Sequence, residues 1–345
     1  MTGIGDGKSL RPRLILVAGR ILLAIALFAF SVTGVLAHPG GLDEYGGHKG
    51  GSVGQYHFHQ GPLVGRSFES RNEALEALRN AGGQGGDGHE IRLASFNIRI
   101  FSDNSRNDRE LDQIVSLLKE YDIVAIQELR DTRVLDRTLD KLREATGVEW
   151  RFEASEPVGR GVKERYAFLY RIDRVLVKNS SKIVDDPKDL FIREPYYATF
   201  RAGNFDFTLL TIHALYKSKN APERKAEFDA LAEVFRSIED GDPTEKDLIL
   251  LGDFNDDPTQ ERFQAIMRIS GLRCLFLPPV KTTISDESLY DNICFRNENL
   301  TEFRERQGVV KFDETMFGGD DEAAKLAVSD HRPVWAVFAT DKDDD

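Results

Sequence analysis

The sequence has few cysteines, no excess of basic charge and only one long apolar run, and each shortage excludes a class of protein. Two cysteines among 345 residues rule out a disulfide-dense scaffold, and their spacing is not that of a metal site. The formal net charge of −12 gives the chain no sequence-independent attraction to nucleic acid. What remains is a globular chain, 41% hydrophobic, long enough for one large domain with a small appendage.

The one long apolar run, 21–35, lies near the N-terminus. It follows three basic residues, ends in the small-residue sequence Val35-Leu36-Ala37, and is interrupted on its N-terminal side by Arg20. It is short for a membrane-spanning helix, so the pattern predicts a cleaved signal peptide over 1–37, with a retained anchor as the alternative. The mature chain would be secreted or periplasmic, free of the membrane, and would carry −15, because the leader holds four bases and one acid.

Cys274 and Cys294 would meet an oxidising compartment after export. They either form a disulfide there, or Cys294 stays a buried thiol within the apolar segment 293–295. The residues themselves leave both outcomes open.

The mature N-terminus is rich in histidine and glycine. Residues 38–66 hold too few large aliphatic side chains for a core of their own, and the segment resembles a short module ending in Tyr-His-X-His that recurs in secreted bacterial proteins. We expect a transition metal such as Zn²⁺ there, and a glycine-rich docking segment is the alternative reading. The candidate ligands are His38, His48, His57 and His59.

Residues 67–89 connect this module to the main domain. Ser70-Arg71-Asn72-Glu73 is a capping box that predicts the start of a short amphipathic helix. The glycine-rich run 81–88 then predicts a linker. The main domain would cover 90–340, and 341–345 would form an acidic tail.

Strand and helix patterns alternate through the main domain. Strands are expected at 91–98, 122–127, 247–251, 292–295 and 334–338, and helices at 108–119, 221–238 and 260–269. Two hairpins are expected between them, one joining 166–170 to 174–177 and one joining 196–201 to 205–212. Mixed hairpins and crossovers without an internal repeat predict an α/β fold, a four-layer α/β/β/α sandwich of two mixed sheets flanked by helices.

Short polar segments follow several of these apolar runs. They are Ser-Phe-Asn-Ile-Arg at 95–99, Ile-Gln-Glu-Leu-Arg at 126–130, Lys-Glu-Arg-Tyr at 163–166, Thr-Ile-His at 211–213, Gly-Asp-Phe-Asn at 252–255, Tyr-Asp-Asn at 290–292 and Ser-Asp-His at 329–331. Side chains at strand ends project into a shared cleft, so segments far apart in sequence can form one site. A single strand-end histidine is usually structural, and it is the combination that indicates an active site.

The residue types in this set suit phosphodiester hydrolysis. Oxygen ligands such as Glu128, Asp330 and the amide of Asn97 favour Mg²⁺, Mn²⁺ or Ca²⁺ over Zn²⁺. His213 and His331 are the only histidines beyond the linker, and hydrolysis needs one base and one acid. Several acids are available to orient the two rings, in the manner of the third member of a catalytic triad.

With these motifs in this order, the chain resembles the endonuclease/exonuclease/phosphatase superfamily and, within it, the secreted deoxyribonuclease I branch. Further likeness to the branch lies in Ser-Glu-Pro-Val-Gly-Arg at 155–160, in 163–171 and in Arg-Glu-Pro at 193–195. The resemblance covers 90–340. It implies that His331 is paired with Asp291 and His213 with Glu164, one histidine acting as base and the other as acid.

The same resemblance assigns the remaining site residues. It implies metal ligation by Asn97 and Glu128 with Asp330 nearby, and contact of Asp253 and Asn255 with the scissile phosphate and the attacking water. Basic groups facing DNA would be Arg99, Arg130 and Arg193, for which a surface salt bridge is the alternative.

Two departures from the family pattern bear on substrate and metal. Val162 stands where the family has a groove-contacting tyrosine, so duplex affinity and sequence preference are in doubt. The loop 185–194 is shorter and lacks the family's small disulfide. Asp186, Asp189 and Glu194 still match its structural calcium ligands, and a solvated acidic loop is the alternative.

The leading hypothesis is a secreted endonuclease that depends on Mg²⁺ or Mn²⁺ and hydrolyses DNA. A phosphodiesterase of the same fold acting on lipid head groups or small phosphate esters is the alternative, because substrate loops vary on one fold. A non-catalytic metal-binding secreted protein is the second alternative. DNA is the expected partner, and nothing in the sequence indicates a stable protein partner.

Overall fold

The computed structural model describes residues 47–50, 55–58, 66–71, 73–74, 77, 89–216, 222–242 and 245–343. All of them belong to the unit Pro39–Asp345. The expected signal peptide over 1–37, together with His38 and His59, lies outside the described residues. Within the described ranges, no helix is long and apolar enough to cross a membrane.

The described residues before the main domain contain a three-stranded antiparallel sheet, which spans the expected module 38–66 and the start of the connecting segment 67–89. Its strands are β1 (Gly47–Gly50), β2 (Gln55–Phe58) and β3 (Ser67–Phe68). Tyr56 on β2 is buried and clusters with Ala74 of the following helical segment. That segment begins as the capping box predicts, because the N–H of Glu73 donates to Ser70 Oγ at 3.1 Å.

The main domain contains two six-stranded sheets, each of mixed direction. One has the order β14-β15-β4-β5-β7-β6 and the other β12-β13-β11-β10-β9-β8. In each sheet one central pair is parallel, β4 with β5 and β10 with β11, and the other pairs are antiparallel.

The strands of the first sheet are β4 (Glu90–Phe101), β5 (Ile123–Leu129), β6 (Trp150–Ala154), β7 (Arg165–Arg171), β14 (Phe303–Val309) and β15 (Val334–Ala339). Those of the second are β8 (Leu176–Ile183), β9 (Tyr196–Ala202), β10 (Phe205–His213), β11 (Leu248–Asp253), β12 (Leu272–Cys274) and β13 (Asp291–Arg296).

Both faces of the central strands are buried, which explains their near-continuous apolar runs. On β4, Leu93 packs into the core between the two sheets. Its neighbour Ala94 points the other way, with Phe96, into a core beneath the outer helices. The alternation along one strand therefore builds two layers of core.

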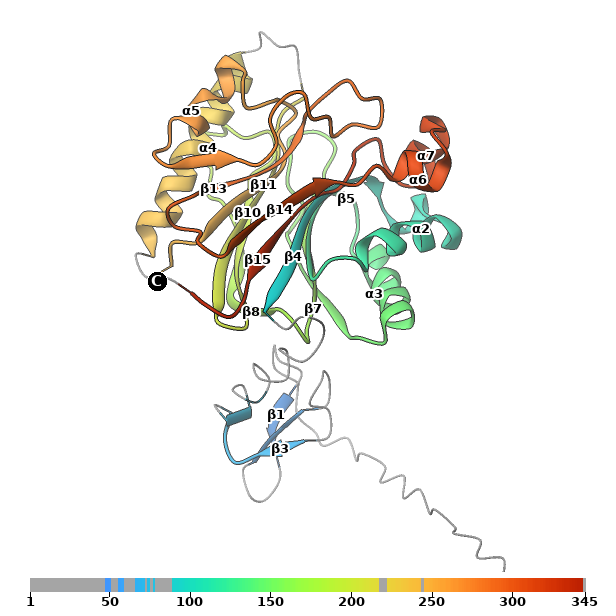
Figure 1. Cartoon of the computed structure of the whole chain (residues 1–345), viewed down its shortest axis with the longest axis vertical. Helices are drawn as coiled ribbons and strands as arrows, with labels where there is room; N and C mark the ends of the chain where they lie inside the picture. Colours follow the sequence, from blue (N-terminus) through green and yellow to red (C-terminus); the bar gives the residue numbers. More distant parts are fainter. Residues whose placement is uncertain are drawn as a thin grey trace, which may run out of the picture. The chain divides into compact units, whose positions relative to one another are not determined.

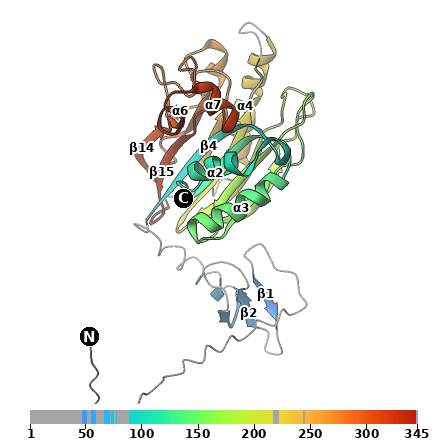
Figure 2. The ribbon, with the colours of Figure 1, turned by 90° about the vertical axis from the view of Figure 1, so that its right-hand side faces the viewer.

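Helices cover the outer face of each sheet, as Figures 1 and 2 show. The β4 sheet is covered by α2 (Asp108–Leu118), α3 (Arg133–Thr146), α6 (Phe312–Phe317) and α7 (Asp321–Ala327). The other sheet is covered by α4 (Pro222–Gly241) and the short α5 (Gln264–Met267). Two short 3₁₀ segments, η1 (Asp103–Ser105) and η2 (Glu261–Phe263), also lie in the main domain. The predicted α/β/β/α sandwich is confirmed.

One predicted hairpin is confirmed and one is wrong. Strands β9 and β10 pair as an antiparallel hairpin, with Ala202 opposite Phe205. Strands β7 and β8, expected to pair, lie in different sheets. The turn 172–175 carries the chain from one sheet to the other, and Ile172 and Val175 are buried in the core between them.

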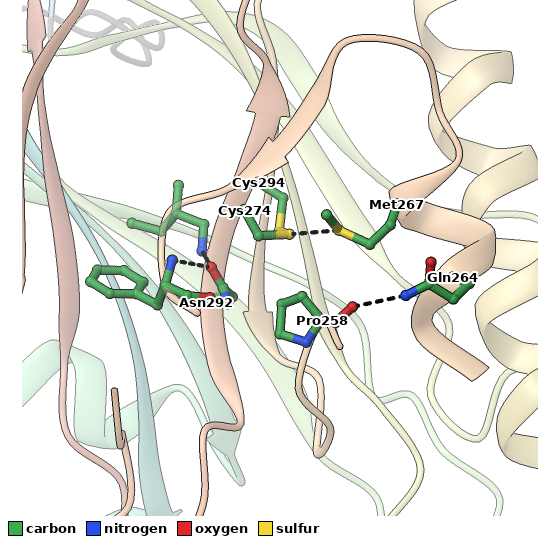
Figure 3. Close-up of a disulfide and its surroundings, with 8 residues drawn as sticks. Pro258, Gln264, Met267, Cys274, Asn292 and Cys294 are labelled. Atoms are coloured by element: carbon green, nitrogen blue, oxygen red, sulfur yellow. Dashed lines mark hydrogen bonds between the residues drawn. A yellow bond between two sulfur atoms is a disulfide. The ribbon is translucent and has the colours of Figure 1, made fainter. Parts of the chain in front are cut away.

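The two cysteines form a disulfide between neighbouring strands (Figure 3). Cys274 on β12 stands opposite Cys294 on β13, and Met267 of α5 packs on Cys274 with 3.8 Å between their sulfur atoms. Of the two outcomes that the residues left open, the pairing is the correct one. The bond fastens an edge strand of three residues to β13, which begins at Asp291.

Candidate active site

A cleft of about 650 Å³ lies at the strand ends that carry the sequence motifs. The carboxyl ends of the two parallel pairs meet at this cleft, because parallel strands end at the same edge of a sheet. The sequence-predicted residues that line it are Arg99, Glu128, Arg130, Arg193, His213, Asp253, Asn255, Asp330 and His331. Asn97, Glu164 and Asp291 are buried and contact these lining residues.

His213, the last residue of β10, is paired with Glu164. Its Nδ1 lies 3.2 Å from Glu164 Oε2, and its backbone N–H donates to the hydroxyl of buried Tyr166 at 2.9 Å. Arg193 forms an ion pair with the same carboxylate and donates to the backbone carbonyl of His213 at 3.3 Å. Burial lowers the pKa of His213 to about 4, so the ring is neutral at pH 7 in the free protein.

His331, before β15, is paired with Asp291 at the start of β13. Its Nδ1 lies 2.9 Å from Asp291 Oδ2, and its backbone N–H donates to Ser329 Oγ at 3.1 Å. Burial alone would lower the pKa of His331, but Asp291 and Asp253 outweigh burial and raise that pKa well above the ordinary value. Burial therefore dominates the pKa of His213, whereas the carboxylates dominate the pKa of His331, and the two pKa values are shifted in opposite directions.

Both rings turn their second nitrogen toward one oxygen of Asp253. His213 Nε2 lies 3.4 Å from Asp253 Oδ2 and His331 Nε2 lies 3.6 Å from it. Asn97 Nδ2 donates to the same oxygen at 2.9 Å. Two histidine–carboxylate pairs and one amide thus converge on a single point, although they come from both sheets.

Glycine at position 252 makes this convergence possible. Its φ is +140°, and a Cβ there would lie 2.1 Å from the backbone oxygen of Ile212 on β10. Because only glycine avoids this clash, the backbones of β10 and β11 can approach closely just before His213 and Asp253.

Three lining residues have a strained backbone. Ile100, Glu128 and Asn255 have φ of +48°, +61° and +52°, in the left-handed region that non-glycine residues rarely occupy. Such outliers persist where surrounding contacts impose them, and they cluster at functional sites. Two hydrogen bonds hold Asn255 in this conformation. Its backbone N–H donates to Asp253 Oδ1 at 2.8 Å, and its side-chain amide donates to the carbonyl of Ala214 at 2.9 Å.

The donor set fits a hard divalent cation. Asn97 Nδ2 lies 3.3 Å from Glu128 Oε1, while its buried amide oxygen has no hydrogen-bond partner. Burial raises the pKa of Glu128, but His213, the Ile100 N–H, His331 and Arg130 outweigh burial and hold that pKa below the ordinary value. Ligand atoms of Asp253, Asp291 and His331 also lie within 4.8 Å of one another, so the cleft offers several carboxylate and amide oxygens to such a cation.

The predicted metal neighbour Asp330 lies at the rim. Its carboxylate is 3.8 Å from Lys325 Nζ, and its side chain is 38% exposed. Among the predicted DNA-facing arginines, Arg130 lies 3.7 Å from Glu128 Oε2 and donates to the carbonyl of Lys163. The guanidinium of Arg193 forms its ion pair with Glu164.

The three predicted calcium ligands are not gathered with the cleft residues. Asp186 Oδ2 accepts the N–H of Phe191 at 2.8 Å, and Asp189 forms an ion pair with Arg160 at 3.2 Å. Among the described residues, the one group of three or more acidic, histidine or cysteine side chains close enough to hold a metal ion is Asp253, Asp291 and His331. Asp186, Asp189 and Glu194 are not part of that group.

In the N-terminal module, His48 and His57 are cross-strand partners. Their Nε2 atoms lie 2.9 Å apart, and a Cβ at Gly50 would come within 2.8 Å of the His57 ring. Gly50 thus leaves room for the two rings.

Sequence reasoning missed several residues around the cleft. Buried Glu227 of α4 accepts the N–H groups of Ile192 and Leu215, at 3.0 and 2.7 Å, and so ties two cleft loops to one helix. Buried Gln127 bridges Ser95 and Thr211, at 3.2 and 3.0 Å, and joins the two sheets. Gln127 belongs to the motif at 126–130, so its role at the site could have been predicted from the sequence. Glu227 could not, because its position in the helix pattern is typical of an exposed acidic residue.

Comparisons with known proteins agree with this geometry. Residues 94–331 match the Endonuclease/Exonuclease/phosphatase family. Deoxyribonuclease-1 of Oryctolagus cuniculus is 32% identical, with 72% of this chain and 92% of that protein covered. A deoxyribonuclease of Thioalkalivibrio sp. (strain K90mix) is 31% identical, with 72% and 71% covered.

Solved structures support the fold. The human Nocturnin catalytic domain superposes with a TM-score of 0.52 at 17% identity, covering 72% of this chain and 94% of that one. TDP2 from C. elegans gives 0.52 at 18% identity, covering 78% and 82%. The chain belongs to the endonuclease/exonuclease/phosphatase family. Its likeness to deoxyribonucleases over most of its length makes it a DNase I-like hydrolase.

Proposed function

We propose that this protein is a secreted, divalent-metal-dependent endonuclease that hydrolyses DNA phosphodiester bonds. The observation that carries the proposal is the convergence of two histidine–carboxylate pairs on Asp253 Oδ2. Relatives named deoxyribonucleases support DNA as the substrate. The disulfide supports an oxidising compartment.

The histidine pairs supply the two proton transfers. Glu164 and Asp291 each hold one ring by its Nδ1–H, so that each Nε2 faces the cleft. One Nε2 takes a proton from the attacking water, and the other gives a proton to the leaving oxygen. Asp253 Oδ2 lies within 3.6 Å of both Nε2 atoms, and Asn255 lines the same cleft, so these two residues would orient the water and the phosphate.

Asn97 and Glu128, with Asp330 at the rim, would hold Mg²⁺ or Mn²⁺. When bound, the ion neutralises charge on the phosphate and so lowers the barrier to attack. Asn97 and Glu128 leave both histidine–carboxylate pairs intact as they ligate. Ligation by Asp253, Asp291 and His331 is less compatible with catalysis, because it competes with the 2.9 Å hydrogen bond between His331 and Asp291.

Local basic groups must overcome the acidity of the whole chain. Arg99 and Arg130 line the cleft and would contact substrate phosphates. The net charge of −12 otherwise repels a polyanion, so activity should depend on both the cation and these side chains.

The flanking segments complete the proposal. The leader 1–37 is removed on export, and the module 38–66 and linker 67–89 precede a nuclease domain over 90–340 with an acidic tail. The loop with Asp186, Asp189 and Glu194 would hold structural Ca²⁺, and His48 and His57 would take part in an accessory transition-metal site.

A nicking assay on the mature wild-type chain tests the proposal. Supercoiled plasmid is incubated with Mg²⁺, Mn²⁺ or Ca²⁺, or with EDTA, beside parallel reactions on RNA and on sphingomyelin. The proposal expects nicked circles with Mg²⁺ or Mn²⁺ and none with EDTA. Turnover of sphingomyelin without nicking would replace it by the lipid phosphodiesterase.

A further inference from the structure

An exposed tyrosine stands at the rim of the cleft. Tyr216, which follows β10, is 71% exposed. Its ring contacts that of Tyr290 edge-on, with 6.3 Å between centroids and 69° between planes. The Tyr290 ring lies 6.2 Å from the ring of His331. A row of three rings thus runs from solvent to a histidine of the site.

This row marks the boundary between two cavities. A second cavity of about 540 Å³ adjoins the catalytic cleft, and Tyr216, Asn255 and Tyr290 line both. Gln260 and Lys281 are among the polar residues that line the second one. A substrate segment that extends from the first cavity into the second would pass beside the rings of Tyr216 and Tyr290.

The charges of the catalytic cleft suit one nucleic-acid strand better than two. Its arginines, among them Arg99 and Arg130, share the lining with the carboxylates of Asp321, Glu322 and Asp330. Double-stranded DNA carries a phosphate charge on each strand at about every 3.4 Å. The acidic residues would repel the phosphates of a second strand, and Val162 offers no ring to a duplex groove.

We propose that Tyr216 and Tyr290 form a stacking surface for an unpaired base next to the scissile phosphate, so that single-stranded or locally unpaired DNA is the preferred substrate. This inference rests on the proposed nuclease function and names its substrate class. Every base has a π-face, so such stacking is tolerant of sequence, and losing it weakens binding by about five- to a hundredfold.

The test compares Tyr216→Ala and Tyr216→Phe with the wild-type mature chain. KM and kcat are measured with Mg²⁺ on a labelled single-stranded oligonucleotide and on a duplex of the same sequence. Leu326→Ala is the matched control, because Leu326 is 62% exposed and lies on α7 outside the cleft lining.

Tyr216→Ala should raise KM on the single strand at least about fivefold, and more than on the duplex. Tyr216→Phe and the Leu326→Ala control should keep the wild-type ratio of the two KM values. An equal change on both substrates, or no change, would overturn the inference while leaving the nuclease function in place. If the wild-type chain cleaves neither DNA, the proposed function falls and this inference falls with it.

Discussion

Asp291→Asn tests the role of one histidine–carboxylate pair with little change in shape. Asp291 is fully buried, and its Oδ2 accepts the Nδ1–H of His331 at 2.9 Å. An amide fills the same volume, but it no longer fixes the ring by a charged acceptor, and it can present N–H to the Nδ1 atom. The His331 ring then loses both the acceptor that orients its Nε2 toward Asp253 and a charge that stabilises its protonated form.

Asp291→Asn should reduce the catalytic rate far more than the stability of the fold. We expect kcat for plasmid nicking to fall by about a hundred- to ten-thousandfold, the range for losing general acid–base assistance. Stability should change by no more than about 2 kcal/mol, because a buried hydrogen bond is weakened while a buried charge is removed.

The pH dependence has a defined sign. In the wild type, Asp291 and Asp253 raise the pKa of His331 against the effect of burial. In the variant the burial remains and one of the two carboxylates is neutral, so the pKa of His331 falls. The limb of the pH–rate profile that His331 governs should therefore move to lower pH, whether the histidine acts as acid or as base.

Asp122→Asn is the matched control, since Asp122 is a buried carboxylate that precedes β5 at the end away from the motif residues. It accepts the N–H of Arg92 at 2.8 Å and should leave the profile unchanged. If Asp291→Asn retains more than about half of the wild-type kcat, or if its profile does not move, the assigned pairing plays no part in catalysis.

Three further predictions concern the groove, the N-terminal module and a buried ion pair. Val162→Tyr should lower KM on duplex DNA, because a ring at this 71%-exposed position adds groove contact that Val cannot reach; an unchanged KM would mean that the residue does not face the duplex. The double variant His48→Ala/His57→Ala of the mature chain should lose one transition-metal ion by elemental analysis, and equal metal content would favour the docking segment. Arg332→Met should lower the free energy of unfolding in urea by about 3–5 kcal/mol, because it leaves Asp313 buried without its bidentate partner. Adding Asp313→Leu should recover most of that stability. If it does not, the unpaired carboxylate is not the cause of the loss.

The strand-end motifs allowed much of the site to be predicted from sequence. Each motif couples a buried strand to a polar ending, so the approximate placement of His213, Asp253 and His331 followed from strand periodicity and the resemblance. The contacts of both histidines with the carboxylates expected for them are present.

What the sequence concealed depends on long-range packing. Periodicity shows that β7 and β8 are strands, but it does not say which sheet each one joins, and the expected hairpin between them was wrong for that reason. Arg332 and Asp313 look like surface charges in sequence, yet both are buried against one another. Tyr216 carries no local signal, because the stacking role proposed for it depends on a ring contact with Tyr290, which lies far along the chain.

The most direct test of the central claim is the rate of plasmid nicking by three single variants in Mg²⁺. His213→Ala, His331→Ala and Glu128→Ala each remove one part of the converging site, and His89→Ala removes an exposed histidine outside it. Each of the three should lower the rate at least about a hundredfold while the circular dichroism spectrum is unchanged, and His89→Ala should match the wild type. Near-wild-type nicking by all three variants would contradict the claim that this cleft hydrolyses DNA.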